Sequence, residues 1–297
     1  MAKILVTGAT GKVGSSAVAH LKGRASVRAF VRDPEKAARM LGDDVELAVG
    51  DFENPDSVKS ALKGMDELLL SSGEVPEKLG HEIGVIDAAV EAGIGRIVKV
   101  STIHAMPGSP LPPLDWHGQI EDHLRVSGVP FVLLQSNFYM TNLLGSAPQI
   151  REGMLFAPAG DGRIAMIDPR DTGEVAAEIL AGEGHEGRTY MLTGPEPVGY
   201  RDVAQALSSA IGREVRFIDV SEEQAWESFV QAGMPDWLVK HLIELFRMVK
   251  KGDLSHVTDT FKALTGHRPR TFAEFARDRA ALFAGSPLPS PGLPEPT

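Results

Sequence analysis

Residues 3–14, KILVTGATGKVG, decide the fold class, because three glycines follow directly after a short apolar run. The apolar run predicts a buried strand, and residues 13–21 predict the helix that follows it. Gly8 permits a sharp turn that a Cβ would obstruct, Gly11 lets the backbone approach a pyrophosphate, and Gly14 lets the helix pack closely on the strand. The N-terminus of such a helix favours bound phosphate. The stretch therefore predicts a dinucleotide-binding loop.

The first half of the chain continues this alternation of strand and helix. Strands are predicted at residues 4–6, 26–31, 45–49, 67–71, 95–101 and 131–135, and helices at 13–21, 34–41, 55–62, 78–92 and 115–126. Apolar strands that alternate with helices form βαβ units, whose right-handed crossovers place helices on both faces of a parallel sheet. We predict an α/β fold with a Rossmann-type, doubly wound parallel sheet over residues 1–150.

The second half is less regular. Helices are predicted at 171–180, 200–211, 222–231, 237–250 and 271–283, with short strands at 190–192 and 214–220. We interpret residues 151–285 as a smaller mixed substrate domain that closes over the cofactor crevice, with some of its segments returning to the main sheet. Residues 286–297 are rich in proline, which excludes a helix and predicts a disordered tail.

Composition excludes several classes of function. The formal net charge of −10 argues against direct contact with nucleic acid or an anionic membrane. The 297 residues include no cysteine, so no disulfide, thiolate metal site or cysteine nucleophile is available, and the histidines lack the spacing of a zinc site. No apolar run is long enough to span a bilayer or to form a signal peptide. We expect a cytoplasmic protein without a metal.

Ligands of a doubly wound sheet bind at the carboxyl ends of its strands. The predicted cofactor-binding residues are Gly8, Thr10, Gly11, Lys12, Val13, Gly14, Arg32, Asp51, Phe52, Ser71, Ser72, Gly73 and Ser101. Arg32 stands at the end of the second predicted strand, where an arginine holds the 2′-phosphate of NADP and a carboxylate would bind the ribose of NAD. Lys12 could add a second cation. The cofactor is therefore predicted to be NADP(H).

Two of these residues have a second interpretation. Arg32 could be a solvated surface charge beside Asp33, which is placed to cap the next helix. Asp51 either faces the adenine or is a turn carboxylate that caps the helix of residues 54–62.

Several stretches, taken together, resemble one known family. They are GATGKVG, FVRDPEKA, GDFENPDSV, LLLSS, STIHA, DWHGQIEDHLRVSGVPFVLLQSNFYMTNLL, AGDG, GHEG and LTGHRPRTFAEFA, and they extend over nearly the whole chain. The set is similar to the NmrA-like atypical short-chain dehydrogenases/reductases, and within them to the NAD(P)H:quinone oxidoreductases. The resemblance implies an NADPH-binding Rossmann domain, a small C-terminal substrate domain and hydride transfer to quinones or related acceptors.

Catalytic short-chain dehydrogenases carry a Tyr-x-x-x-Lys pair on the helix after the fifth strand, and residues 115–126 contain neither residue type. This argues against an alcohol dehydrogenase or an epimerase. A quinone accepts hydride readily, so positioning in a dry site can supply much of the rate. The candidate proton donors are His104, His117, Asn137 and Tyr139. Alternatively, His104 bonds only its own loop, His117 caps its helix and Tyr139 is an interface aromatic.

We therefore expect an NADPH-dependent oxidoreductase that transfers hydride to a small quinone-like acceptor. The alternative is a non-enzymatic NADP(H)-binding redox sensor of the NmrA type, because the family also contains regulators without turnover. The sequence leaves open whether the chain acts as a homodimer.

Overall fold

The computed structural model describes residues 1–285 and groups the chain into two compact units. Unit 1 consists of Met1–Ser136, Pro169–Leu192 and Thr260–His267. Unit 2 consists of Asn137–Asp168, Thr193–Asp259 and the described residues from Arg268 onward. The tail predicted at residues 286–297 lies outside the described residues.

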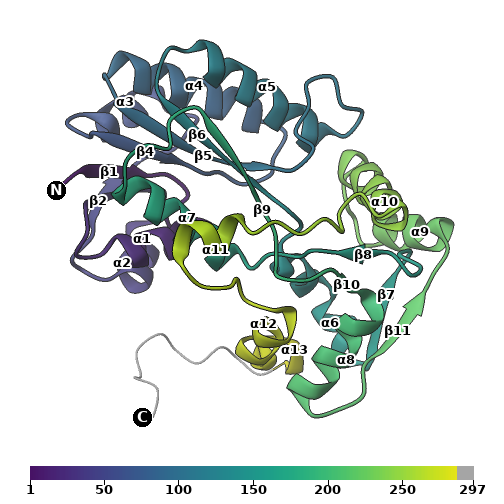
Figure 1. The fold of residues 1–297 in the computed structure, drawn as a ribbon. Helices are drawn as coiled ribbons and strands as arrows, with labels where there is room; N and C mark the ends of the chain where they lie inside the picture. The colour runs from purple at the N-terminus through teal and green to yellow at the C-terminus, as the bar shows by residue number, and fades with distance from the viewer. Residues whose placement is uncertain (286–297) are drawn as a thin grey trace, which may run out of the picture. The chain divides into compact units, whose positions relative to one another are not determined.

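A seven-stranded parallel sheet in the order β3-β2-β1-β4-β5-β6-β9 forms the centre of unit 1 (Figure 1). The strands are β1 (Lys3–Val6), β2 (Ser26–Val31), β3 (Glu46–Val49), β4 (Glu67–Leu70), β5 (Arg96–Thr102), β6 (Phe131–Ser136) and β9 (Arg188–Leu192). The order reverses between β1 and β4, and in such sheets ligands bind beyond the carboxyl ends of the strands at this switch point. The predicted α/β class and its doubly wound parallel sheet are confirmed.

Helices cover both faces of this sheet (Figure 1). One face carries α3 (Pro55–Leu62), α4 (Lys78–Glu91) and α5 (Pro112–Val126), and the other carries α1 (Lys12–Leu21), α2 (Pro34–Leu41), α7 (Pro169–Ala181) and α11 (Thr260–Thr265). The starts of α2 and α3 follow from their sequences, since each has proline in its first turn behind a capping side chain. Asp33 accepts a hydrogen bond from the Lys36 N–H (2.9 Å), and Asn54 accepts one from the Ser57 N–H (3.3 Å).

An apolar core fills the space between the sheet and α3, α4 and α5. Leu68, Ile97 and Leu133 enter it from three neighbouring strands, and Ile86 and Ile120 enter it from the helices, all without solvent exposure. Burial of each such side chain stabilises the fold by about 1.5–3 kcal/mol relative to exposure. This core fixes α4 and α5 on the sheet and so determines where their polar residues lie.

Unit 2 contains two short sheets and several helices. Its elements are η1 (Met140–Ser146), α6 (Ala147–Arg151), β7 (Met154–Ala157), β8 (Arg163–Ile164), β10 (Val198–Gly199), α8 (Tyr200–Ile211), β11 (Arg216–Asp219), α9 (Glu222–Gln231), α10 (Asp236–Lys251), α12 (Phe272–Asp278) and α13 (Ala280–Ala284). Strands β7 and β11 pair in parallel, and β8 and β10 pair antiparallel. Residues 271–283, predicted as one helix, form α12 and α13 instead. The break at Arg279 accompanies an edge-to-face contact between the buried rings of Phe275 and Phe283, whose centroids are 6.3 Å apart.

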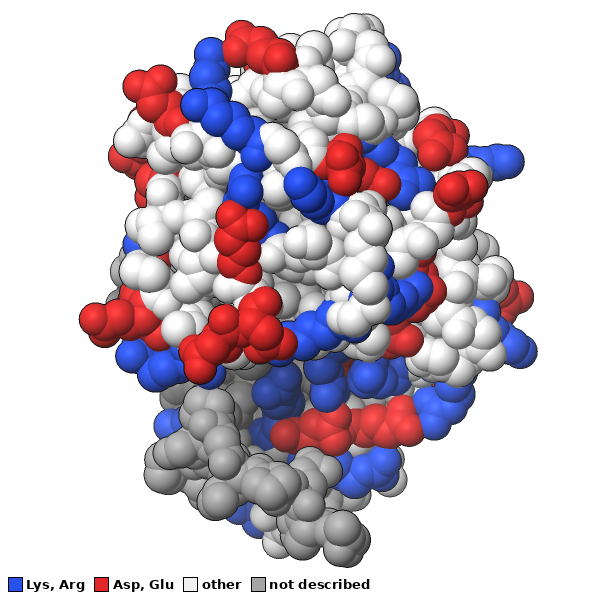
Figure 2. Space-filling model, turned by 90° about the vertical axis from the view of Figure 1, so that its left-hand side faces the viewer, with Lys and Arg blue, Asp and Glu red and all other residues white. Residues whose placement is uncertain are grey.

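The surface carries both signs of charge. Figure 2 shows acidic and basic side chains interspersed on the face that it draws, without a large field of either sign. Within residues 1–285, no helix combines the length and the apolar character needed to cross a membrane.

The junction of β1 and α1 is the tightest backbone contact that the glycine loop makes. A Cβ added at Gly14 would lie 2.3 Å from the carbonyl oxygen of Gly8 and 2.9 Å from the Cα of Ala9. Because backbone atoms form both contacts, no side-chain rotation can relieve them.

We therefore expect Gly14→Ala to lower the free energy of unfolding by about 1–3 kcal/mol, because α1 must move away from β1. Gly84→Ala is the matched control, since a Cβ there meets nothing within 4 Å and alanine favours a helix interior by up to about 1 kcal/mol. Urea unfolding of both variants measures the difference. Equal stabilities would show that the Gly14 contact is relieved without strain.

Candidate functional site

The loop between β1 and α1 turns at Gly8, whose φ is +59°. A Cβ at Gly8 would also lie 2.7 Å from the carbonyl oxygen of Ser71, so both the conformation and the contact with the end of β4 require glycine. Helix α1 begins after Gly11, which has no side chain to cap it, and its first turn contains no acidic residue. No side-chain cap or carboxylate there competes with a bound anion for the first N–H groups of the helix.

The carboxyl ends of β1 and β4 are joined through Thr7. The Ser71 N–H donates to Thr7 Oγ1 (2.9 Å), and Thr7 Oγ1 lies 3.0 Å from the carbonyl oxygen of Ser71 and 3.1 Å from that of Leu69. A Cβ added at Gly73, farther along the same loop, would meet nothing within 4 Å. The backbone at the switch point is therefore fixed by hydrogen bonds at Thr7 and Ser71, and the space beside Gly73 is unfilled.

Two cationic residues follow the first two strands. Arg32 comes directly after β2, with its side chain 83% exposed and its Nε 4.0 Å from Asp51 Oδ2. Lys12 is the first residue of α1, and partial burial lowers its pKa from the ordinary value. Thr10 and Val13 belong to the same loop and helix start, where Val13 is buried.

Asp51 and Phe52 lie in the loop after β3. Asp51 Oδ1 accepts a hydrogen bond from the Glu53 N–H (3.0 Å), so Asp51 is a turn carboxylate, while the cap of α3 is Asn54. The Phe52 ring lies 5.6 Å from that of Phe30 and 5.9 Å from that of His81. A contact of either residue with adenine stays a prediction.

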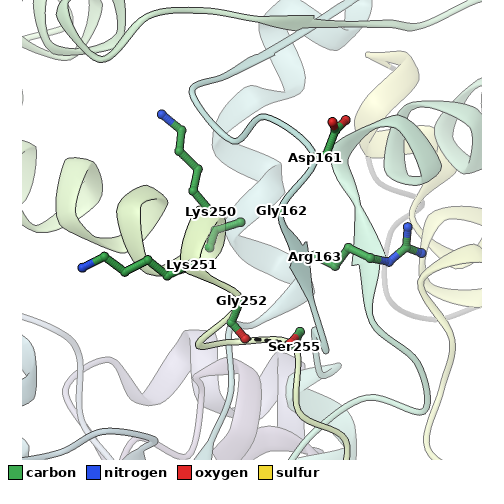
Figure 3. Close-up of a pocket in the computed structure, with 8 residues that line it drawn as sticks. Asp161, Gly162, Arg163, Lys250, Lys251, Gly252 and Ser255 are labelled. Carbon is green, nitrogen blue, oxygen red and sulfur yellow. Dashed lines mark hydrogen bonds between the residues drawn. The ribbon is translucent and has the colours of Figure 1, made fainter.

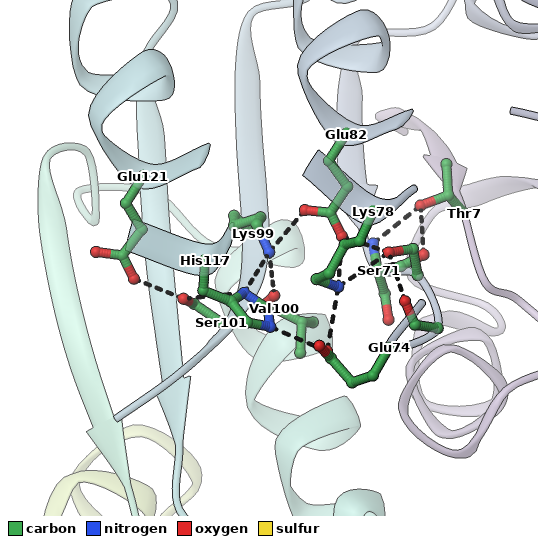
Figure 4. Close-up of polar contacts among 12 residues, drawn as sticks. Thr7, Ser71, Glu74, Lys78, Glu82, Lys99, Val100, Ser101, His117 and Glu121 are labelled. Carbon is green, nitrogen blue, oxygen red and sulfur yellow. Dashed lines mark hydrogen bonds and ion pairs between the residues drawn. The ribbon is translucent and has the colours of Figure 1, made fainter. Parts of the chain in front are cut away.

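A buried polar cluster occupies the carboxyl end of the sheet face that α4 and α5 cover (Figure 4). Its members are Ser72, Glu74, Lys78, Glu82, Lys99, Ser101, His117 and Glu121. Strand periodicity places Lys99 and Ser101 on the same face of β5 as the core residue Ile97. Helical i,i+4 spacing places Lys78 with Glu82 on α4, and His117 with Glu121 on α5.

Lys99 is the most deeply buried cation of the polar cluster, with no exposed side-chain surface. Its Nζ lies 2.7 Å from Glu82 Oε2, 3.1 Å from His117 Nδ1 and 2.5 Å from the carbonyl oxygen of Val100. The Glu82 carboxylate is equally buried, so each of these charges is compensated by the other.

Lys78 connects this ion pair to the loop after β4. Its Nζ donates to Glu82 Oε1 (2.9 Å) and Ser72 Oγ (3.0 Å) and lies 3.2 Å from Glu74 Oε1. The same Glu74 oxygen lies 3.0 Å from His117 Nε2. Because the Glu74 side chain is 48% exposed, it forms the solvent-facing end of the polar cluster.

Glu121 forms the other end of the polar cluster. The Ser101 hydroxyl donates to its Oε1 (2.5 Å), and the Gln135 amide donates to the same oxygen (2.9 Å). Arg125 Nη2 donates to Glu121 Oε2 (2.8 Å). Ser101 Oγ also lies 3.4 Å from His117 Nδ1, so the predicted residues Ser72, Ser101 and His117 meet in one network.

Burial and neighbouring charge shift the ionisation of this network. Burial, and next the positive charges of Lys99 and Lys78, lower the pKa of His117 to about 4, although Glu74 acts in the opposite direction. Burial alone would raise the pKa of Glu82, but the charges of Lys78 and Lys99 outweigh it and hold that pKa well below the usual range. Near pH 7 we therefore assign a neutral imidazole beside ionised Glu82.

His104 lies two residues beyond β5 in an exposed loop. Its φ of +61° makes it the one non-glycine residue with positive φ among residues 1–285. The left-handed conformation is unfavourable by about 1–2 kcal/mol for such a residue, and retained strain of this kind is common at functional sites.

The other catalytic candidates have different surroundings. His117 lies inside α5, which begins at Pro112, so it does not cap this helix. Asn137 belongs to unit 2, where its Nδ2 donates to the Leu254 carbonyl (3.0 Å) and its Oδ1 accepts from the Phe138 N–H (2.7 Å). These bonds favour a structural role for Asn137. Tyr139, also in unit 2, forms a bridge with Ile167, and its catalytic role stays a prediction.

Comparison with known proteins places this architecture in a family. Residues 1–276 match the NmrA-like family. The chain belongs to the NmrA-like family. NAD(P)H azoreductase of Xenophilus azovorans is 37% identical, covering 95% of this chain and 100% of its own length. Quinone oxidoreductase 2 of Escherichia coli is 33% identical, covering 91% of this chain and 96% of its own length.

Solved structures agree with the family assignment. The NADPH complex of the Escherichia coli quinone oxidoreductase superposes with a TM-score of 0.83 at 33% identity, covering 93% of this chain and 99% of that one. The NADP(H) complex of Citrobacter sp. triphenylmethane reductase gives a TM-score of 0.80 at 28% identity, covering 94% and 99%. The family resemblance expected from the sequence motifs is confirmed.

Sequence reasoning misses the five lysine and glutamate members of the polar cluster, namely Glu74, Lys78, Glu82, Lys99 and Glu121. A signal is nevertheless present, because Lys99 interrupts the apolar strand RIVKVS and a lysine is rarely buried without a partner. Residues 78 and 82 and residues 117 and 121 also form i,i+4 pairs of ionisable residues. No group of three or more His, Cys, Asp or Glu side chains in the described part of the chain could hold a metal ion.

Unit 2 contains a pocket with a volume of about 360 Å³ between the loop of residues 161–163 and the end of α10 (Figure 3). Lys250 and Lys251 leave the helix in different directions, and the Arg163 guanidinium is paired with Asp202 (2.8 Å). The cations therefore do not converge on one point, and none of the predicted site residues lines this pocket.

The lowered pKa of His117 predicts a stability change with pH. In the unfolded chain His117 binds a proton near pH 6.5, whereas the folded protein binds it only near pH 4. The unfolded state thus binds more protons between these values, so the free energy of unfolding falls as the pH falls, by roughly 2–3 kcal/mol from pH 7 to 4.5.

We expect His117→Gln to remove this part of the pH dependence, as measured by urea unfolding at a series of pH values. Val126→Ala at the end of the same helix is the matched control, because Val126 is exposed and carries no titratable group, so the slope should stay unchanged. A His117→Gln slope equal to that of the natural sequence would contradict the prediction.

Proposed function

We propose that this chain is an NADPH-dependent reductase that transfers hydride to a quinone or a similar electron-poor acceptor. The observation that carries the proposal is the β1–β4 switch point, where a glycine turn and the start of α1 follow β1. Arg32 directly follows the neighbouring strand β2. Two family members, the azoreductase and the quinone oxidoreductase, are named as reductases of this kind. Their names support the reaction class, and the acceptor of this chain is our proposal.

The residues at the switch point fit a dinucleotide. The close backbone contacts at Gly8 and Gly14 leave no space for a side chain, and the N-terminus of α1 favours a pyrophosphate. Arg32, exposed beside Asp51, would hold the 2′-phosphate through a charge-assisted hydrogen bond. The bound cofactor supplies the hydride.

The remaining predicted contacts are assigned by their place along the strands. Loop residues Thr10, Gly11, Lys12 and Val13 would complete the pyrophosphate site. Asp51 and Phe52 would lie at the adenine, and Ser71, Ser72, Gly73 and Ser101 beside the nicotinamide half. The crowded contacts of Thr7 and Ser71 would keep the crevice in one shape when the cofactor binds.

The residues of α5 favour an acceptor that needs little acid catalysis. This helix carries His117 and Glu121 and has neither tyrosine nor lysine. A quinone is electron-poor and accepts hydride readily, and the product is a stabilised phenolate. Orientation of the two reactants and one hydrogen-bond donor to the phenolate oxygen therefore suffice for catalysis. His104 and His117 are the candidates for that donor in unit 1.

The test is turnover of purified protein with NADPH and a panel of small quinones and azo compounds, followed by the loss of nicotinamide absorbance. We expect quinone-dependent oxidation of NADPH, with slower oxidation of NADH. Tight NADPH binding without turnover of any acceptor would overturn the reductase and support the NADP(H) sensor instead. A sensor should also bind NADP⁺ and NADPH with clearly different affinities.

The role of Arg32 has a separate test. We expect Arg32→Ala to weaken NADPH binding by about 1–3 kcal/mol, because it removes a charge-assisted bond to the 2′-phosphate. NADH lacks that phosphate and should bind as before, which isothermal titration with both cofactors will measure. Arg39→Ala, which removes an exposed cation from α2, is the control for a general change of charge. Equal weakening of both cofactors by Arg32→Ala would rule out the assignment.

A further inference from the structure

The contact between Lys99 Nζ and His117 Nδ1 determines the state of His117. Lys99 Nζ donates a hydrogen bond to the Val100 carbonyl and lies 3.1 Å from His117 Nδ1, while Glu82 Oε2 is its ion-pair partner at 2.7 Å. Burial lowers the pKa of Lys99, while the Glu82 carboxylate beside it favours the charged form, and we assign the ammonium on that contact. An ammonium donates hydrogen bonds and accepts none. His117 Nδ1 must therefore accept, and it carries no proton.

The second nitrogen of His117 agrees with this assignment. Its Nε2 lies 3.0 Å from Glu74 Oε1, and a carboxylate oxygen can only accept. The opposite tautomer would place an N–H against the Lys99 ammonium and a lone pair against the Glu74 carboxylate. Both contacts would be repulsive, so the surroundings fix one neutral tautomer, with its hydrogen on Nε2.

The charges around His117 maintain this state from every packed element. Lys99 and Ser101 face it from β5, Lys78 and Glu82 lie behind them on α4, Glu74 approaches from the loop after β4, and Glu121 lies one turn farther along α5. Glu82 holds both lysines, at 2.7 Å and 2.9 Å. Removal of Lys99 would leave Nδ1 open to protonation, with Glu82 now free to favour that proton.

We propose that Lys99 is a positioning residue that keeps His117 a neutral donor at physiological pH, with its Nε2–H directed to the loop after β4. The tautomer of His117 does not depend on the proposed reductase function, and only the catalytic role of His117 rests on that function. In the reaction, an acceptor oxygen would take the place of Glu74 at Nε2. Hydride adds two electrons and one hydrogen to the acceptor, the neutral imidazole stabilises the resulting oxyanion by a hydrogen bond, and the proton that completes the reduction comes from water.

The assignment can be tested without turnover by ¹⁵N NMR of histidine-labelled protein between pH 5 and 8. His117 is identified by the signals that His117→Gln removes. We expect the Nε2–H tautomer in the natural sequence and no titration in this range. In Lys99→Met we expect a mixed tautomer and at least a tenfold increase in proton affinity, so that titration enters the range.

Two further variants keep the test decisive. Lys63→Met, at an exposed position of the same unit, should leave the His117 signals unchanged. If Lys99→Met does not fold, Lys99→Met/Glu82→Gln removes one charge of each sign and should still release the tautomer. An Nδ1–H tautomer or a titration near pH 6.5 in the natural sequence would overturn the proposal.

The pH profile of kcat/KM distinguishes this proposal from the proposed function. We expect no ionisation of His117 in the profile of the natural sequence between pH 5.5 and 8, and a new ionisation in that of Lys99→Met. If NMR gives the expected tautomer but no acceptor is turned over, the proposed reductase function is wrong and the positioning role of Lys99 still holds. Turnover whose profile is the same in both proteins would show that His117 does not contact the acceptor.

Discussion

The close backbone approach at the ends of β1 and β4 is the constraint on which the site depends. A Cβ at Gly8 would meet the Ser71 backbone, a Cβ at Gly14 would meet that of Gly8, and Thr7 joins the two strand ends by hydrogen bonds. These contacts fix the direction in which α1 leaves the sheet, with its N-terminus at the carboxyl end of β1, beside the switch point. The anion site is therefore a consequence of packing in the backbone and needs few side chains of its own.

The sheet face under α4 and α5 changes character along each strand. It is apolar at Ile97 and ionic from Lys99 onward, so one surface serves as core at one end and as polar network at the other. Ion pairs buried this deeply add little net stability, because desolvation offsets their attraction. They do define one arrangement, since removal of Glu82 leaves the buried Lys99 without its carboxylate, and removal of Lys99 leaves Glu82 only Lys78.

The sequence permits prediction of the features that depend on local pattern. The glycine loop, the cap residues Asp33 and Asn54 and the alternation of strands and helices all follow from neighbouring residues. The polar cluster could not be predicted in this way, because Lys99, Glu82 and His117 come from three elements and only the packed fold brings them together. The two-residue strands β8 and β10 are too short to show periodicity, and the break at Arg279 depends on packing of rings eight positions apart.

The composition of unit 1 from three separate segments has a consequence for synthesis of the chain. When residue 136 leaves the ribosome, β6 is the outer strand of an incomplete sheet, and its partner β9 is 52 residues away. Until then its unpaired edge can join a strand of another chain. A newly made chain therefore passes through a stage in which the edge of β6 can pair with another chain. This stage ends when β9 is made and pairs with β6.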